Sequence, residues 1–297
     1  MTKKFHITKA VFPVAGFATR FLPITKTIPK EMLPIIDTPL IQYAVEEAVE
    51  AGINEVIFIT SQNKVEIEDY FDKNAELETK LQYDGKSQLI SSINHILPDN
   101  VTNVYMRQID SLGLGHAVLC AKKLIHNEPF AVILPDDLME DSNGSCLKNM
   151  ISFYEDNPEV SCVLAAKEVH PLVRHQYGII SLRSDHPQEC RVEALIEKPT
   201  SDQVQSNLAI LGRYILSPKI FTELEKNAST KNGELQLTDA ISNLLWTQNI
   251  QIYRFNGTHF DCGSKLGFIK ANLSYAVKRA DLRSELIDFM KDLLSSV

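Results

Sequence analysis

The chain has 297 residues, of which 44% are hydrophobic, enough to form one large α/β domain or two smaller ones. Its formal net charge of −8 argues against a general affinity for nucleic acid or an anionic membrane, and no apolar run approaches the roughly 20 residues that cross a bilayer. The five cysteines are widely spaced and contain no C-x-x-C pair, which favours a reducing cytoplasm over a disulfide framework or a zinc site.

Strand-like and helical segments alternate through the first half of the chain. This βαβαβ rhythm predicts a doubly wound, Rossmann-like sheet, mainly parallel, with helices on both faces. A polar segment over 75–97, the polar excursion, interrupts this alternation of strands and helices and is expected to be helical. Strands are expected at 10–15, 55–61, 103–108 and 130–137, and helices at 39–53, 64–72 and 115–125.

The second half departs from this rhythm, because its strand-like runs follow one another with few helices between them. They predict an antiparallel or mixed extension of the same sheet. A helix, a strand and a long helical tail from Ser264 close the chain, and the tail is expected to pack on the sheet or against another subunit. The expected strands are 160–169, 177–183, 190–199, 206–217 and 250–255, and the helix is 236–247.

Three polar features follow strands of the first half directly: the loop 15–20, the segment from Gln108, and the acidic pair Asp136 and Asp137. Ligands of doubly wound sheets bind at the carboxyl ends of the strands. The loop, within "PVAGFATRFLP", joins a strand to an arginine through Gly16, and glycine lets backbone N–H groups approach an anion.

Charge is unevenly distributed. Residues 1–30 carry six basic side chains and no acid, whereas the remainder carries 24 basic against 38 acidic residues. Lys3, Lys4 and Lys9 are equally well explained as a solvated terminus. Arg20, Lys26 and Lys30 lie among apolar residues beside the loop and favour a small anionic ligand.

Common phosphate and catalytic motifs are absent. The sequence has no G-x-x-x-x-G-K-[ST], G-x-S-x-G or H-E-x-x-H, which disfavours a P-loop kinase, an α/β-hydrolase and a zincin. "GLGHAV" at 113–118 is a weak dinucleotide match, because Val118 replaces the third glycine.

A set of spaced segments is more specific: "AGFATRFLP" (15–23), "PKEMLPIIDTPLI" (29–41), "RQIDSLGLGHA" (107–117), "EKP" (197–199), "GELQLTDAI" (233–241) and "FDCGSKLG" (260–267). In their order and residue identities these segments resemble those of the bacterial-type UTP–glucose-1-phosphate uridylyltransferases, a group of sugar-phosphate nucleotidyltransferases. The resemblance extends from about Lys9 to Tyr275.

The resemblance implies an enzyme that transfers uridylyl from UTP to α-D-glucose 1-phosphate and yields UDP-glucose and pyrophosphate, assisted by Mg²⁺. It implies a single domain over 1–297, with a mainly nucleotide-binding part (1–140), a mainly sugar-binding part (141–263) and a helical tail (264–297). The family commonly forms dimers or tetramers, so the resemblance also implies a homodimer or homotetramer. The cysteines and the net charge predict a cytoplasmic protein that binds no nucleic acid or membrane.

The same resemblance assigns roles to individual residues. Two aspartates match the metal ligands, three basic residues match the catalytic cations, and the others match residues around the nucleotide or the sugar. They are Asp136 and Asp261 (metal), Arg20, Lys30 and Lys198 (catalytic), Ala15, Gly16, Thr19, Glu31, Gln108 and Gly113 (nucleotide), and Gly178, Glu197 and Glu234 (sugar).

Several points stay open at this stage. Asp137 and Lys265 have no assigned role, His116 and Cys262 are expected to be structural, and Ala18, where the family has glycine, is expected to have an ordinary negative φ. The alternative functions are a sister transferase that uses dTTP, ATP, CTP or another sugar 1-phosphate, and a non-catalytic paralogue. A nicotinamide-dependent oxidoreductase would need the fingerprint that Val118 interrupts.

Overall fold

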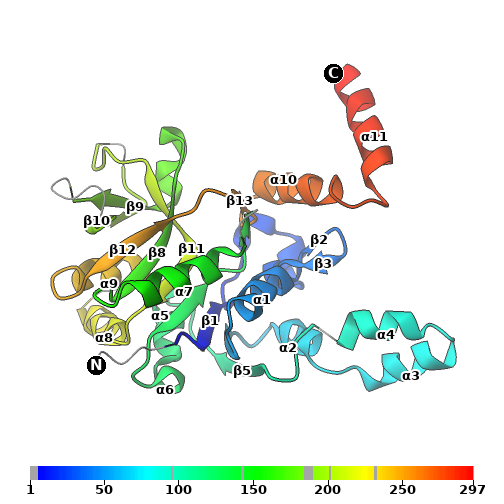
Figure 1. Ribbon diagram of the computed structural model, residues 1–297, viewed down its shortest axis with the longest axis horizontal. Coiled ribbons are helices and arrows are strands. Elements are labelled where there is room, and N and C mark those ends of the chain that lie inside the picture. Colours follow the sequence, from blue (N-terminus) through cyan, green and yellow to red (C-terminus); the bar gives the residue numbers. More distant parts are fainter. Residues whose placement is uncertain are drawn as a thin grey trace.

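The computed structural model describes residues 6–94, 96–141, 144–183, 190–200, 202–230 and 233–296. Lys3 and Lys4 lie outside the described residues. Within these residues, one mixed sheet forms the centre of the molecule, and its main path runs in the order β10-β9-β11-β6-β1-β4-β5 (Figure 1).

The first half of the chain forms the parallel part of this sheet. Strand β1 pairs in parallel with β4 and β6, and β5 pairs in parallel with β4, as the alternating pattern predicts. The helices between these strands are shorter than expected, and the predicted helix 115–125 divides in two at Ala121. The elements are β1 (Lys9–Pro13), α1 (Leu40–Glu50), β4 (Glu55–Thr60), α2 (Val65–Phe71), β5 (Thr102–Arg107), α5 (Leu114–Cys120), α6 (Lys122–Ile125) and β6 (Phe130–Ile133).

The second half extends the sheet with mostly antiparallel strands, which confirms the predicted extension. Strand β11 pairs antiparallel with β6, β8 and β9, and it is buried along its whole length because its side chains belong to the clusters on both faces of the sheet. Strand β10 pairs antiparallel with β9, and β12 pairs in parallel with β8. These elements are β8 (Cys162–Glu168), β9 (Gly178–Leu182), β10 (Val192–Glu197), β11 (Leu208–Leu216) and β12 (Ile250–Arg254), with helices α7 (Cys146–Asp156), α8 (Ile220–Thr230) and α9 (Leu237–Leu244).

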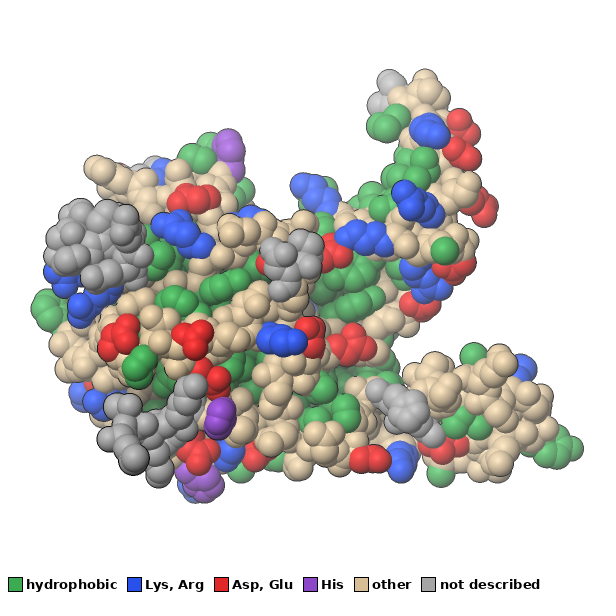
Figure 2. Space-filling view, viewed as in Figure 1, with side chains coloured by type: hydrophobic (Ala, Val, Ile, Leu, Met, Phe, Trp, Pro, Cys, Tyr) green, Lys and Arg blue, Asp and Glu red, His purple; other side chains and the backbone are tan. Residues whose placement is uncertain are grey.

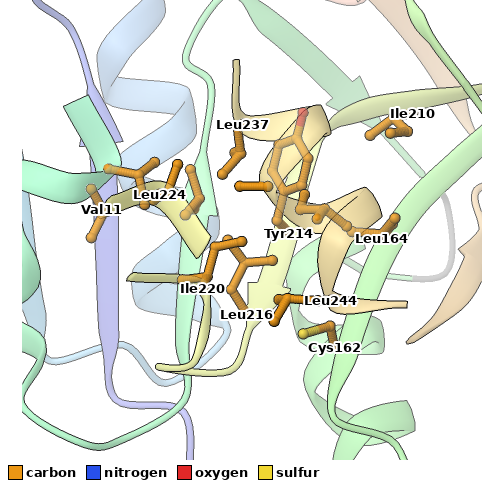
Figure 3. Close-up of a cluster of buried hydrophobic side chains, with 14 of the residues drawn as sticks. Val11, Cys162, Leu164, Ile210, Tyr214, Leu216, Ile220, Leu224, Leu237 and Leu244 are labelled. Carbon is orange, nitrogen blue, oxygen red and sulfur yellow. The ribbon is translucent and has the colours of Figure 1, made fainter. Parts of the chain in front are cut away.

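Apolar side chains fill both faces of the sheet. On β1, Val11 belongs to the cluster under α5, α8 and α9, whereas Phe12 belongs to the cluster under α1 and α7, as the alternation of a strand requires. Figure 3 shows side chains of the first cluster, among them Leu224 from α8 beside Val11 of β1, and Ile220 from α8 beside Leu216 of β11. Burial on both faces fixes the carboxyl ends of the strands relative to one another.

Short elements complete the edge of the sheet where the strands end. The hairpin β2 (Pro34–Ile35) and β3 (Thr38–Pro39) follows three 3₁₀ helices, η1 (Thr19–Phe21), η2 (Ile24–Lys26) and η3 (Lys30–Met32). A separate antiparallel pair, β7 (Asp137–Glu140) with β13 (Thr258–Asp261), places Asp261 opposite Asp137. A further 3₁₀ helix, η4 (Pro171–Gln176), precedes β9.

The tail divides into two helices with different surroundings. Helix α10 (Lys265–Ala276) begins at Ser264, whose hydroxyl accepts a hydrogen bond from the Gly267 N–H, and it contacts β2 and β13. Helix α11 (Arg283–Ser295) has no buried residue and stands away from the sheet, so packing of the whole tail on the sheet is wrong (Figure 1). Contact with another subunit stays a prediction.

The remaining features of the fold are two polar helices and a surface of mixed charge. The polar excursion forms α3 (Ala75–Tyr83) and α4 (Ser87–Asn94), as expected. In the described part of the chain, no helix has the length and apolar character needed to cross a membrane. Figure 2 shows basic and acidic side chains interspersed over one face of the molecule.

Candidate active site

Two connected cavities lie at the carboxyl ends of the strands. One has a volume of about 470 Å³ and the other about 670 Å³, and both are lined by Arg20, Asp136 and Glu234. The residues predicted for the nucleotide line the first cavity, together with Lys30: Ala15, Gly16, Thr19, Glu31, Gln108 and Gly113. Those predicted for the sugar line the second, together with Lys198 and Asp261: Gly178, Glu197 and Glu234. The structure therefore brings all of the predicted site residues into one cleft.

The loop after β1 forms one wall of the smaller cavity. A Cβ added at Gly16 would meet no atom within 4 Å, so this backbone faces open space that a ligand can approach closely. Arg20, on η1, donates from Nη1 to the Gly263 carbonyl oxygen at 3.2 Å, which directs its guanidinium toward the region shared by the two cavities.

The conformation of Ala18 differs from the expectation. Its φ is 52° and its ψ is 45°, in the left-handed region, so the expected negative φ is wrong. The physical reason is the turn itself: Ala18 is the residue at which the loop enters η1, and its carbonyl oxygen accepts hydrogen bonds from the Phe21 N–H and the Thr25 hydroxyl. These contacts hold alanine in a conformation that glycine adopts more easily.

Two buried polar side chains form the inner end of this cavity. Gln108 donates from Nε2 to the Gly113 carbonyl oxygen at 3.2 Å, and the same nitrogen lies 2.8 Å from His116 Nδ1. Glu31 is 1% exposed; its Oε2 accepts a hydrogen bond from Lys64 Nζ at 2.8 Å, while its Oε1 has no hydrogen-bond partner among the described residues. A ligand bound in the cavity can supply the missing donor.

The loop around Gly113 is tied to the sugar side by the backbone. The Leu235 N–H donates to the Leu112 carbonyl oxygen at 2.7 Å, and the Gly115 N–H donates to the Leu235 carbonyl oxygen at 2.8 Å. Gly113 has a φ of +96°, and a Cβ there would lie 2.8 Å from the Leu235 carbonyl oxygen, so the close approach requires glycine.

An ion pair lies where the cavities meet. Lys30 Nζ and Asp136 Oδ2 are 2.5 Å apart. Burial alone would lower the pKa of Lys30, but the negative charges of Asp136 and Glu31 outweigh it and raise this pKa to about 12. Burial alone would raise the pKa of Asp136, yet the Lys30 charge outweighs it and lowers that pKa. Both groups are therefore charged at neutral pH.

Asp261 faces Asp136 from the other side. A Cβ added at Gly263 would lie 2.8 Å from Asp136 Oδ2 and 3.0 Å from Asp261 Oδ1, so these oxygens are less than about 6 Å apart. Burial, with the charges of Asp137 and Asp136, raises the pKa of Asp261. Two facing carboxylates that repel each other fit a hard divalent cation. Among the described residues, no three His, Cys, Asp or Glu side chains form a metal site by themselves, so phosphate or water oxygens would have to complete the coordination.

The larger cavity contains a carboxylate with a fixed orientation. Glu197, at the end of β10, accepts a hydrogen bond through Oε2 from the Thr238 hydroxyl at 2.7 Å, and a Cβ added at Gly178 would lie 3.2 Å from the same oxygen. Lys198 follows with a φ of 45°, and its N–H donates to the Tyr177 carbonyl oxygen at 3.0 Å. Its side chain is 57% exposed, with Nζ 3.7 Å from Glu197 Oε1, so the ammonium can turn toward an anion in the cleft.

Sequence analysis did not single out three side chains that support this site. Lys64 contacts Glu31, Thr238 contacts Glu197, and His259 Nε2 lies 2.5 Å from Asp137 Oδ1. Thr238 lies within the segment "GELQLTDAI", so this motif could have indicated that Thr238 belongs to the site. Lys64 and His259 carry no local signal, because their partners are far away in the sequence.

This cleft, in which cations flank a carboxylate pair at the strand ends of an α/β sheet, is suited to transfer between phosphorylated substrates. A family model described as nucleotidyl transferase matches residues 9–278. The chain is 43% identical to the UTP–glucose-1-phosphate uridylyltransferase of Bacillus subtilis over 290 residues, which cover 97% of this chain and 98% of the relative.

Solved structures agree with this result. UTP-bound UGPase from Acinetobacter baumannii superposes with a TM-score of 0.88 at 43% identity, covering 97% of this chain and 99% of that one. A UDP-glucose pyrophosphorylase complexed with UDP-glucose gives a TM-score of 0.82 at 44% identity, covering 92% and 100%. The chain belongs to the nucleotidyl transferase family, among the bacterial UTP–glucose-1-phosphate uridylyltransferases, and the predicted fold class is confirmed.

Proposed function

We propose that the protein transfers the uridylyl group of UTP to glucose 1-phosphate and releases UDP-glucose and pyrophosphate. One observation carries the proposal beyond family membership. The basic side chains Arg20 and Lys30 and the carboxylates Asp136 and Asp261 lie where a nucleotide-sized cavity meets a second cavity, which ends in Glu197 and Lys198. Two anionic substrates can therefore meet at that position.

The reaction is a direct displacement. An oxygen of the sugar phosphate attacks the α-phosphorus of UTP, a new P–O bond forms, and the bond to the bridging oxygen of pyrophosphate breaks in line. Arg20 and Lys30 bind the triphosphate and offset the charge that develops on the leaving pyrophosphate, while Lys198 binds the phosphate of the sugar. No protein nucleophile is needed.

Asp136 and Asp261 would hold Mg²⁺, which has a strong preference for carboxylate and phosphate oxygens and would neutralise charge on the phosphates. The raised pKa of Asp261 supports this assignment, since burial and the charges of Asp137 and Asp136 disfavour an unpaired carboxylate there, and a bound cation would offset them. Lys30 holds Asp136 in its ionised form, and so keeps one ligand oxygen ready to bind a cation.

Polar groups at both ends of the cleft would recognise the substrates. Ala15, Gly16, Thr19, Glu31, Gln108 and Gly113 would surround uracil, ribose and phosphates, where an amide and a carboxylate can read both donors and acceptors. Glu197 would accept hydrogen bonds from sugar hydroxyls beside the Gly178 backbone. Glu234 lines both cavities and is the least specific of these assignments.

The same proposal covers the organisation of the protein. Residues 1–140 would serve mainly the nucleotide, 141–263 mainly the sugar, and 264–297 would form the tail. We place the protein in the cytoplasm, which is supported by its free cysteines, and expect a homodimer or homotetramer. Sedimentation velocity tests the assembly, and a strictly monomeric protein would refute it.

Pyrophosphate release tests the activity. The protein is incubated with Mg²⁺, glucose 1-phosphate and, in turn, UTP, dTTP, CTP or ATP. UTP should be the preferred nucleotide, and EDTA should abolish the release. Preference for another nucleotide would move the protein to a sister transferase, and no release with any of them would favour a non-catalytic paralogue.

A further inference from the structure

Lys64 is a buried lysine behind the nucleotide side of the cleft. It precedes α2, and only 6% of the residue is exposed. Its ammonium donates hydrogen bonds to Glu31 Oε2 at 2.8 Å and to the carbonyl oxygen of Val14. A lysine that is removed from water in this way needs such partners to remain charged.

One of these contacts fixes the start of the loop. Val14 lies between β1 and the loop that begins at Ala15, and its own N–H donates to the Ile59 carbonyl oxygen at 2.9 Å. Strand β4 thus holds the N–H of Val14, and Lys64 holds its carbonyl oxygen. The orientation of the peptide unit from which the loop starts therefore depends on Lys64.

The other contact fixes a carboxylate in the cavity wall. Lys64 occupies one oxygen of Glu31 and leaves Oε1 buried without a partner among the described residues. An unpartnered buried acceptor at the inner end of a ligand cavity points to a donor on the ligand. Its position is useful only if the carboxylate cannot rotate, and the ammonium prevents this rotation.

We propose that Lys64 is a positioning residue for the nucleoside, which holds the Glu31 carboxylate and the first peptide of the loop in their binding geometry without touching the substrate. This inference rests on the proposed function, because it assumes that the smaller cavity binds the uridine nucleotide. The inference predicts that Lys64 affects binding of UTP and not binding of the sugar phosphate, because the sugar side lies in the other cavity.

The test is Lys64→Met, which keeps an unbranched side chain of similar length and removes the ammonium. We expect the dissociation constant of UTP, measured by calorimetry without sugar, and the KM for UTP to rise at least about tenfold. The KM for glucose 1-phosphate should change less than about twofold. Loss of a merely structural lysine would not raise the KM for UTP while leaving the KM for glucose 1-phosphate nearly unchanged.

Lys9→Met is the matched control. Lys9 Nζ also donates to a main-chain carbonyl oxygen, that of Leu124 at 2.9 Å, and lies 3.7 Å from Glu55 Oε2, but it does not line either cavity. This variant should lose stability without a selective change in UTP binding. A comparable effect of Lys9→Met on UTP binding, or unchanged UTP binding in Lys64→Met, would overturn the inference.

A second variant keeps the test decisive if Lys64→Met fails to fold. The pair Lys64→Met with Glu31→Gln removes both charges. Its loss of UTP affinity should exceed that of Glu31→Gln alone by less than about tenfold, because only the Val14 contact of Lys64 is left to lose. A further tenfold loss would contradict this. If the unsubstituted protein binds UTP but forms no UDP-glucose, the proposed function fails while the binding comparison still decides the role of Lys64.

Discussion

The N–H of Cys262 donates a hydrogen bond to the carbonyl oxygen of Asp136 at 2.8 Å. This bond continues the pairing of β7 with β13 and brings Asp136 and Asp261 together from distant parts of the sequence. The thiol of Cys262 has no part in the contact. Its burial raises the pKa of the thiol to about 12, which agrees with the expected structural role.

Asp136→Asn should lower kcat by about 100-fold or more, because it removes a charge from the place where the phosphates meet. Steady-state kinetics with UTP, glucose 1-phosphate and Mg²⁺ measures the effect, and circular dichroism checks the fold. Asp84→Asn is the control, since Asp84 directly follows α3, far from the cleft lining, and pairs with Lys80 at 2.9 Å. Near-normal Mg²⁺-dependent turnover of the Asp136 variant would refute the metal assignment.

Asp261→Asn should stabilise the metal-free protein while reducing its activity. The folded pKa of Asp261 is raised, so its charge costs stability above that pKa, and the cost disappears as the pH falls toward the ordinary value of 3.8. The Tm of the variant should therefore exceed that of the unsubstituted protein at pH 7, with the difference closing below pH ~4. Mg²⁺ should raise the Tm of the unsubstituted protein only. A lower Tm of the variant in EDTA would contradict the repulsion.

Lys198→Ala should chiefly weaken the use of glucose 1-phosphate. Loss of one charge-assisted contact to a phosphate corresponds to about 1.5–3 kcal/mol, or roughly 10- to 100-fold in kcat/KM. Since the side chain is 57% exposed, the Tm should change little. Titration of each substrate against a saturating concentration of the other measures the change, and unchanged kinetics would remove Lys198 from the site.

Ala18→Gly should stabilise the protein by about 0.5–1 kcal/mol, because glycine relieves the left-handed conformation but also makes the unfolded chain more flexible. Denaturant unfolding measures the difference. The KM for UTP should stay within about threefold, since the η1 contacts of the Ala18 carbonyl oxygen remain. A net loss of stability would show that the alanine is not strained.

Gly115→Ala should destabilise the protein by about 1–3 kcal/mol. The new Cβ would lie 2.7 Å from the Leu235 carbonyl oxygen and 2.9 Å from Leu224 Cδ2, so α5 and the segment before α9 must move apart. The KM values of both substrates should rise together. Gly16→Ala is the stability control, because its Cβ would meet no atom within 4 Å. An unchanged free energy of unfolding of Gly115→Ala would show that α5 and the segment before α9 move apart without an energetic cost.

Local patterns were sufficient for the sheet and for the location of the cleft. The apolar run 56–59 within β4 and the alternation of strands and helices predicted a parallel core, and polar residues after β1, β5 and β6 indicated the correct edge. Patterns failed where distant residues decide. The partners of Lys64 lie 33 and 50 positions away, and α11 has an amphipathic sequence of which no residue is buried in the described chain. The φ of Ala18 is a local failure, because it depends on the turn into η1 that the sequence pattern did not reveal.

The hydrogen bonds between Leu112, Gly115 and Leu235 have a consequence for how specificity can change. They make the segment that carries Gly113 and the segment that carries Glu234 one rigid partition between the two cavities. A mutation that reshapes one compartment through this partition must also reshape the other. A new sugar preference is therefore more accessible through Glu197 and its surroundings on β10, where the nucleotide compartment has no wall in common.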